Sequence, residues 1–226
     1  VRSSAASDVY KRQIDKNLQV AKIKRENESL RQDLELKNRQ LEQSLRRVEE
    51  VAATDPLTGL YNRRHFGKVL EQLFAEAQRY DSDLSCVMID LDGYKQLNDA
   101  FGHQIGDQLL VVAAKAITAN LRRMDVAARY GGDEFVLLLP RAGGPEASGV
   151  VVRVRDDFRL ASAALLRRNA GVTMSIGIAS LRADNVSGTE QLVALADAAL
   201  YQAKAQGRNC IVISDSVGPA AGPVAR

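Results

Sequence analysis

The chain has 226 residues, which allows one ordinary domain and an additional segment. An apolar content of 46% is enough for a buried core, and 26% charged residues predict a soluble surface. The formal net charge is only +3, and no basic block alternates with aromatic residues, so a nucleic acid polymer is not an expected partner.

Two further features bear on location. Cys86 and Cys210 both lie in apolar runs, which is typical of buried free thiols in a reducing compartment. No apolar stretch reaches the roughly 18 residues of a membrane span, and no signal peptide is recognisable. We therefore expect a cytoplasmic location and no membrane segment in this chain.

Residues 1–13 contain the run SSAASDVYKRQ, which back-translates to a transposase-type sequencing adapter. We interpret this segment as an artefact and leave it out of the fold prediction. The natural protein is then expected to continue upstream, with a sensor domain that this sequence does not contain.

Residues 14–53 are predicted to form a coiled-coil stalk that joins two copies of the chain. Apolar side chains recur every seven residues, and Asn27 at an a position is typical of parallel dimers. The two seam positions hold Val20, Asn27, Leu34, Leu41 and Val48, and Ile23, Leu30, Lys37, Ser44 and Val51. A lone solvated helix is the alternative, but the apolar stripe of so polar a helix needs a partner to become buried.

A globular domain is predicted over residues 54–215, and a tail rich in Gly, Pro and Ala at 216–226 is expected to be disordered. Periodicity predicts helices over 66–80, 107–121, 146–168 and 190–206, and another beginning near Tyr94. Apolar runs predict strands over 84–90, 126–130, 134–139, 172–180 and 210–213. The glycine-rich residues 131–133 predict a tight hairpin, so an α+β fold is expected.

The first candidate site is the run MIDLDGYK at residues 88–95. Asp90 ends an apolar strand, where its carboxylate can bind a hard cation. N–H groups of the turn and of the following helix can hold phosphate oxygens. The alternative is that Asp90 only caps that helix.

The second candidate site is the hairpin RYGGDEF at residues 129–135. Its two glycines let a ligand approach the backbone closely, although turns also carry Gly and Asp for conformational reasons alone. If Asp133 meets Asp90 across adjacent strand ends, the two carboxylates can chelate one or two magnesium ions.

The sequence resembles the GGDEF family of diguanylate cyclases, whose name-giving letters stand at residues 131–135. The match is an ordered series of DPLTGLYNRR at 55–64, DLDGYKQLNDAFGHQIGD at 90–107, SIG at 175–177 and ADAALYQAKAQGRN at 196–209. The resemblance implies a nucleotidyl-cyclase-like α+β domain with a mainly antiparallel central sheet flanked by helices, preceded here by a coiled-coil helix. It also implies that a dimer condenses two GTP into cyclic di-GMP and two pyrophosphates.

The resemblance implies a role for each matching residue. Two Mg²⁺ or Mn²⁺ ions per active site are held by Asp90, the Leu91 carbonyl, Asp133 and Glu134. The implied catalytic residues are Asp133, Glu134 and Lys95, with Asp133 as the base for the ribose 3′-hydroxyl. The implied GTP contacts are Gly93, Tyr94, Asn98, His103, Asp107, Gly132, Lys204 and Arg208.

Some of these contacts have simpler explanations. Lys204 and Arg208 also suit a solvated helix end, and His103 suits a helix cap or a packing role. The Asp107 carboxylate can accept hydrogen bonds from guanine N1–H and the exocyclic amine, which favours GTP over ATP. Tyr94 stands where the family more often has Phe.

Residues 122–125 (RRMD) have the spacing of the family's inhibitory RxxD motif. The resemblance implies that cyclic di-GMP binds Arg122 and Asp125, with Arg153 as a second contact, and inhibits the enzyme. A charged helix end is the alternative. Two other functions stay open, namely a non-catalytic receptor for cyclic di-GMP or GTP and a structural role in which the stalk dimerises a partner; the intact metal acids favour the enzyme.

Overall fold

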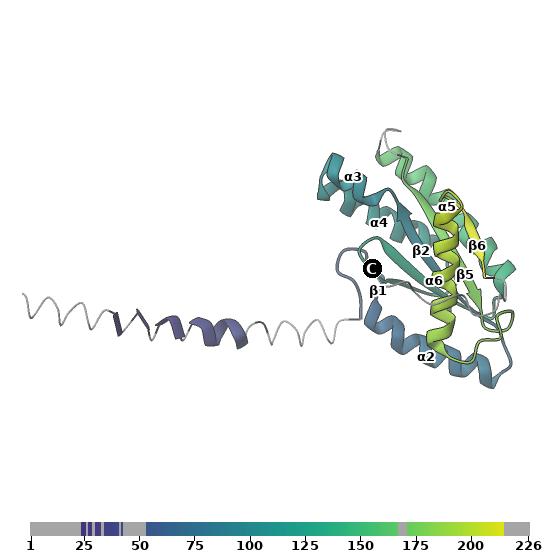
Figure 1. Ribbon diagram of the computed structural model, residues 1–226, viewed down its shortest axis with the longest axis horizontal. Coiled ribbons are helices and arrows are strands. Elements are labelled where there is room, and N and C mark those ends of the chain that lie inside the picture. Colours follow the sequence, from purple (N-terminus) through teal and green to yellow (C-terminus); the bar gives the residue numbers. More distant parts are fainter. Residues whose placement is uncertain are drawn as a thin grey trace, which may run out of the picture. The chain divides into compact units, whose positions relative to one another are not determined.

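A computed structural model of the chain describes residues 53–166 and 171–214, together with scattered positions between 24 and 42 (Figure 1). The chain divides into two units, residues 1–52 and 53–226. No helix of the described ranges is long and apolar enough to cross a membrane.

In the first unit the described residues are helical and exposed. They include Asn27 and Lys37, and also Leu30 and Leu34, which are 60% and 57% exposed in the single chain. The other predicted seam positions, residues 1–13 and the tail from 216 lie outside the described residues. Pairing through the seam therefore stays a prediction.

The second unit interleaves strands with helices. Its elements are β1 (Tyr61–Asn62), α2 (Arg63–Arg79), β2 (Leu84–Asp92), α3 (Tyr94–Phe101), α4 (His103–Asn120), β3 (Val126–Arg129), β4 (Glu134–Pro140), α5 (Gly144–Leu165), β5 (Thr173–Ser180), α6 (Thr189–Ala205) and β6 (Ile211–Ile213).

The strands form one sheet in the order β1-β3-β4-β2-β5-β6. The three inner pairings, β3–β4, β4–β2 and β2–β5, are antiparallel. Each edge strand is parallel to its neighbour, β1 to β3 and β6 to β5. This arrangement confirms the predicted α+β fold, its mainly antiparallel sheet and the hairpin between β3 and β4. Strand β1 was not predicted, because two residues are too few to show a period of two.

Helices cover both faces of the sheet (Figure 1). Val87, Ile89 and Leu91 of β2 belong to one hydrophobic cluster with residues of α3, α4 and α5. The alternate residues Cys86 and Met88 belong to a second cluster with α2 and α6. Because side chains of a strand alternate between the faces, each face of β2 buries a separate core layer.

Helix α6 packs very closely on β5 at Gly177. A Cβ at this position would overlap the backbone of Ala196 and Leu200. Only glycine allows this approach, which draws the C-terminal end of α6 toward the ends of β2 and β5. Lys204 is thereby delivered to the predicted metal acids.

Two helices begin a full turn or nearly so before the predicted start. Helix α2 starts at Arg63, where the Asn62 side chain caps it by accepting a hydrogen bond from the His65 N–H at 2.9 Å. Helix α4 starts at His103 rather than Asp107. Their first turns are largely polar and exposed, so apolar periodicity gave no sign of them.

Candidate active site

The alternation of β2 places Asp90 on the sheet face that α6 covers. Met88, two residues earlier, belongs to the cluster with α6, so the Asp90 side chain points to the same face. Asp90 pairs directly opposite Glu134 of β4. The Lys204 ammonium of α6 binds the Asp90 carboxylate, with Nζ 2.7 Å from Oδ2. Two acids and a cation from three elements thus meet at one end of the sheet.

The electrostatics of these acids are coupled. Burial raises the pKa of Asp90 above its ordinary value, Lys204 lowers it, and the negative charges of Asp133 and Asp92 raise it further. Burial also raises the pKa of Glu134, which Asp90, Asp133 and Asp197 raise further and Lys204 lowers. A site with so many carboxylates needs additional positive charge, and Lys204 supplies part of it.

A cavity of about 820 Å³ opens beside these acids. It brings together eight of the predicted site residues, namely Asp90, Leu91, Gly93, Tyr94, Lys95, Asp133, Lys204 and Arg208. The cavity is lined both by carboxylates and by the cations of α3 and α6. This combination suits a ligand that carries phosphate groups.

Asp92 has a different role from Asp90, although both belong to the same short motif. It is only 6% exposed and accepts hydrogen bonds from Thr173 Oγ1 and Ser175 Oγ, each at 2.7 Å. The backbone N–H of Asn209 donates to it at 3.1 Å. These bonds tie β2 to β5 and to the turn after α6, so Asp92 positions the wall of the cavity.

Arg129 holds the hairpin turn in place. Its Nε and Nη2 donate to the Gly132 carbonyl at 3.2 and 2.8 Å, and its Nη1 donates to the Asp55 carboxylate at 3.2 Å. Asp55 in turn accepts hydrogen bonds from the Thr58 N–H and hydroxyl. At the far side of the turn, the Leu91 N–H donates to the Asp133 carbonyl at 3.3 Å. The turn is therefore fixed from both sides.

The donor chemistry of the acids fits a hard divalent cation. Asp90, Asp133, Glu134 and the Leu91 carbonyl are oxygen donors at one strand end, as Mg²⁺ and Mn²⁺ prefer. Within residues 53–166 and 171–214, no three His, Cys, Asp or Glu side chains are gathered closely enough to chelate a metal. Lys204 lies at the carboxylate where a cation would bind, and it is the group that would have to move.

Other predicted residues lie outside the 820 Å³ cavity. Glu134 lines a separate cavity of about 620 Å³ between α2 and α6, which Asp197 also lines. Asn98 packs on Gly106 of α4, while His103 and Asp107 are exposed on the first turns of that helix. Gly132 is exposed, and its carbonyl is occupied by Arg129.

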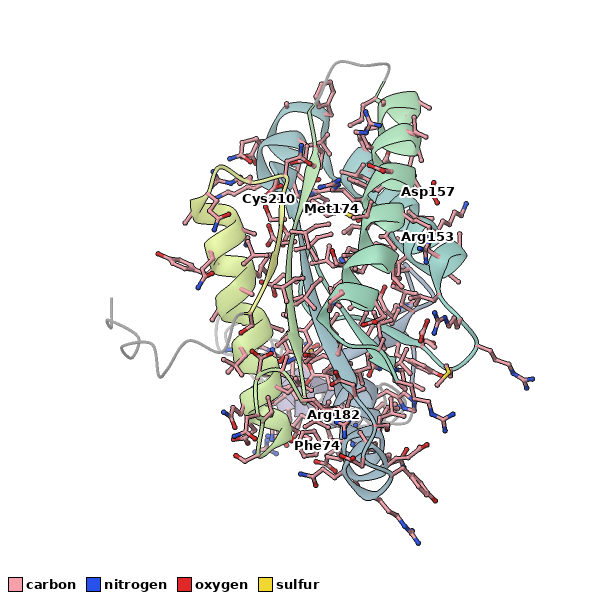
Figure 2. All side chains as sticks on the ribbon, turned by 90° about the vertical axis from the view of Figure 1, so that its right-hand side faces the viewer. Phe74, Arg153, Asp157, Met174, Arg182 and Cys210 are labelled. Atoms are coloured by element: carbon pink, nitrogen blue, oxygen red, sulfur yellow. The ribbon has the colours of Figure 1, made fainter. Side chains whose placement is uncertain are left out.

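The residues of the predicted product site lie on another part of the domain. Arg122 and Asp125 line a third cavity, of about 480 Å³, together with Thr54 and Tyr61. Asp125 accepts a hydrogen bond from the Arg122 N–H at 2.7 Å, which closes the turn before β3. Arg153 lies exposed on α5 and donates to the Gly149 carbonyl at 2.9 Å (Figure 2).

Asp55, Asp92 and Arg129 lie within the sequence motifs, but the motifs predicted no individual role for them. The contacts that join them to other elements run to residues at least 74 positions away in the sequence, so local spacing held no signal for those contacts. The only sequence signal for a polar contact there was that Thr173 and Ser175 lie on the same face of a predicted strand.

Clustered strand-end carboxylates beside a cation-lined cavity on an α+β scaffold are features suited to a phosphate-rich ligand. The chain belongs to the diguanylate cyclase, GGDEF domain family, which matches residues 52–210.

Several relatives are similar over most of this chain. The response regulator PleD of Caulobacter vibrioides is 37% identical over 211 residues, which are 91% of this chain and 44% of PleD. Diguanylate cyclase DgcS of Shewanella oneidensis is 39% identical over 166 residues, which are 72% of this chain and 53% of DgcS. The chain thus spans about half the length of these curated relatives.

Solved structures give the same relationship. One is the coiled coil and GGDEF domain of DgcB from Caulobacter crescentus in complex with c-di-GMP. The match has a TM-score of 0.63 and 31% sequence identity, and it covers 82% of this chain and 98% of that one.

Proposed function

We propose that this chain condenses two GTP molecules into cyclic di-GMP and releases two pyrophosphates. The observation that carries the proposal is the 820 Å³ cavity, whose lining combines the acids Asp90 and Asp133 with the cations Lys95, Lys204 and Arg208. Membership of a family with relatives named diguanylate cyclase supports the choice of reaction.

The triphosphate binds at the start of α3 and the end of α6. Gly93, which precedes α3, and Tyr94, its first residue, line the cavity at the helix end where the dipole favours an anion. Lys95 and Arg208 are exposed there and can move to meet phosphate oxygens.

Two divalent ions, Mg²⁺ or Mn²⁺, would be held by Asp90, the Leu91 carbonyl, Asp133 and Glu134. When bound, they neutralise charge that develops on the phosphate oxygens. With the charge of Asp90 balanced in this way, the Lys204 ammonium would be free to bind phosphate.

The guanine base lies against α3 and α4. Asn98 and Asp107 read its edge. The two residues come from neighbouring helices but lie near each other, because Asn98 packs on Gly106, the residue before Asp107. Adenine cannot donate the two hydrogen bonds that a carboxylate accepts from guanine, which opposes ATP. His103 borders this position, and the Gly132 backbone borders the phosphates.

The reaction joins two GTP molecules held by two copies of the domain. The 3′-hydroxyl oxygen of one ribose bonds to the α-phosphorus of the other GTP, and the bond from that phosphorus to the bridging oxygen breaks as pyrophosphate leaves. The hydroxyl proton passes to the Asp133 carboxylate, with Glu134 and Lys95 stabilising the charged groups. In a second step of the same kind the two nucleotides exchange roles. The 3′-hydroxyl of the other ribose bonds to the remaining α-phosphorus, the second pyrophosphate leaves, and the ring closes.

A homodimer held by the stalk brings the two sites together. The exposure of Leu30 and Leu34 in a single chain supports this, since both fall on the predicted seam. Linking two domains raises the local concentration of one site near the other. Leu34→Lys should shift the protein from dimer to monomer in analytical ultracentrifugation and lower activity; an unchanged dimer would remove this part of the proposal.

The stalk also offers a route for an upstream sensor to act. Inserting one to seven residues after position 51 rotates the catalytic domains relative to the stalk, because each residue turns a helix by about 100°. We expect activity to vary periodically with insertion length, and equal activity across the whole series would exclude the stalk as a route of control.

Cyclic di-GMP inhibits its own synthesis by binding the 480 Å³ cavity at Arg122 and Asp125, with Arg153 as a contact from α5. The guanidinium of Arg122 suits a phosphodiester, and Asp125 can accept from a guanine edge. Arg122→Ala should abolish inhibition by added product while leaving the initial rate intact.

The deciding experiment incubates purified protein with GTP and Mg²⁺ and separates the products by chromatography. The parent should form cyclic di-GMP and pyrophosphate, and Asp133→Ala should form neither. Asp156→Ala, at a half-exposed carboxylate on α5, is the matched control and should behave as the parent. Cyclic di-GMP binding without product formation would indicate the receptor function instead.

A further inference from the structure

Two side chains of α3 meet at Gly106 on α4. A Cβ on Gly106 would overlap Asn98 Oδ1, and it would lie 3.0 Å from the Tyr94 hydroxyl oxygen. The Tyr94 hydroxyl and the Asn98 amide therefore share the small space that this glycine leaves open.

The amide oxygen in this space lacks a donor. Asn98 Oδ1 is buried and has no hydrogen-bond partner in the described part of the chain. Burying a carbonyl oxygen without a donor carries a free-energy cost, so a donor brought to it stabilises the amide in one orientation. The Tyr94 hydroxyl can donate one hydrogen bond and can rotate to do so.

Helix geometry and packing bring the two groups together. Tyr94 and Asn98 are four residues apart on α3, which places their side chains on the same helix face. The Tyr94 ring packs against the hydrophobic core with α4 and also lines the 820 Å³ cavity. The hydroxyl is thus held by its ring near Asn98 and cannot move far from it.

We propose that Tyr94 is a positioning residue for base recognition. Its hydroxyl donates to Asn98 Oδ1 when a guanine nucleotide binds, and this turns the two N–H bonds of the Asn98 amide toward the base. A phenylalanine at this position would leave the amide oxygen without a donor and the amide free to rotate. This inference rests on the proposed function only for the identity of the nucleotide.

A double-mutant cycle tests the coupling between the two side chains. The proteins are the parent, Tyr94→Phe, Asn98→Ala and the double variant. The probe is GDP, which carries the same base but has no pyrophosphate to release, and its affinity is measured by titration calorimetry. KM and kcat for cyclic di-GMP formation are measured in parallel.

Tyr94→Phe should weaken GDP binding and raise KM about fivefold, the effect of one neutral hydrogen bond, with kcat little changed. In the Asn98→Ala background the same substitution should have no further effect. Tyr80→Phe, at a ring that is 64% exposed, is the matched control and should equal the parent. An unchanged affinity in Tyr94→Phe, or an equal loss in both backgrounds, would overturn the inference.

Gly106→Ala gives an independent test, because the new methyl group would displace the Asn98 amide. Alanine is favourable within a helix, so the variant should fold, as circular dichroism can verify. It should weaken GDP binding at least as much as Asn98→Ala, and wild-type affinity would count against the inference. A parent that binds GDP but makes no cyclic di-GMP refutes the proposed function alone, whereas a parent that binds no GDP refutes both.

Discussion

The guanidinium of Arg129 binds the backbone carbonyl of Gly132 through two nitrogens, at 3.2 and 2.8 Å. Its third nitrogen binds the Asp55 carboxylate in the loop before β1. The Arg129 and Asp55 side chains are 18% and 17% exposed, so solvent screens this contact only partly. One side chain thus links the N-terminal loop to the turn that carries Asp133.

Arg129→Lys tests whether this link depends on the geometry of the guanidinium group or only on its positive charge. A lysine keeps the positive charge but lacks the planar fork that reaches both partners at once. We expect the rate of cyclic di-GMP formation to fall about tenfold, since the catalytic turn is less well fixed. Arg141→Lys, whose guanidinium is 68% exposed and 4.0 Å from Glu76, is the matched control. Equal rates for both variants would show that the link does not position the turn.

The pH dependence of stability should show the contribution of Asp55. Burial raises the pKa of Asp55, but hydrogen bonds from Thr58 and the nearby Arg129 outweigh it and hold the pKa below its ordinary value of 3.8. A carboxyl group with a lowered pKa in the folded state stabilises the fold above its ordinary pKa. This stabilisation is lost as pH falls through the folded-state value.

The stability difference between the parent and Asp55→Asn should therefore be constant near neutral pH and shrink below about pH 4. Urea unfolding at pH 7 and at pH 3.5 measures it. A difference that grows in acid would contradict the assigned hydrogen bonds.

The main effect of Asp92→Asn should be a loss of fold stability. An amide offers one acceptor oxygen where the carboxylate accepts bonds from Thr173, Ser175 and the Asn209 N–H. We expect a loss of about 2 kcal/mol in the free energy of unfolding, the usual effect of disrupting a buried charged network. Asp156→Asn, at a half-exposed carboxylate, is the control, and an equal change in both would argue against a structural role for Asp92.

The acidic residues of the site could be predicted from the sequence, but the residues that hold them in position could not. Asp90 and Glu134 could be placed because an apolar strand leads directly into one and starts at the other, and both motifs are local. The roles of Asp92 and Arg129 depend on residues 81 and 74 positions away, Thr173 and Asp55. Contacts of that kind follow from strand order, which local periodicity does not determine.

Removal of the Lys204 charge should change two affinities in opposite directions, that for a metal ion and that for a nucleotide. Its ammonium lies 2.7 Å from the Asp90 carboxylate that a divalent cation is expected to occupy. Lys204→Met should therefore bind Mn²⁺ several-fold more tightly without nucleotide, because a competing positive charge is gone. The same variant should bind GDP about tenfold more weakly, because a phosphate contact is lost. Lys115→Met, at an exposed site on α4, should change neither affinity. Weaker Mn²⁺ binding by Lys204→Met would show that the lysine supports the acid site instead of competing for it.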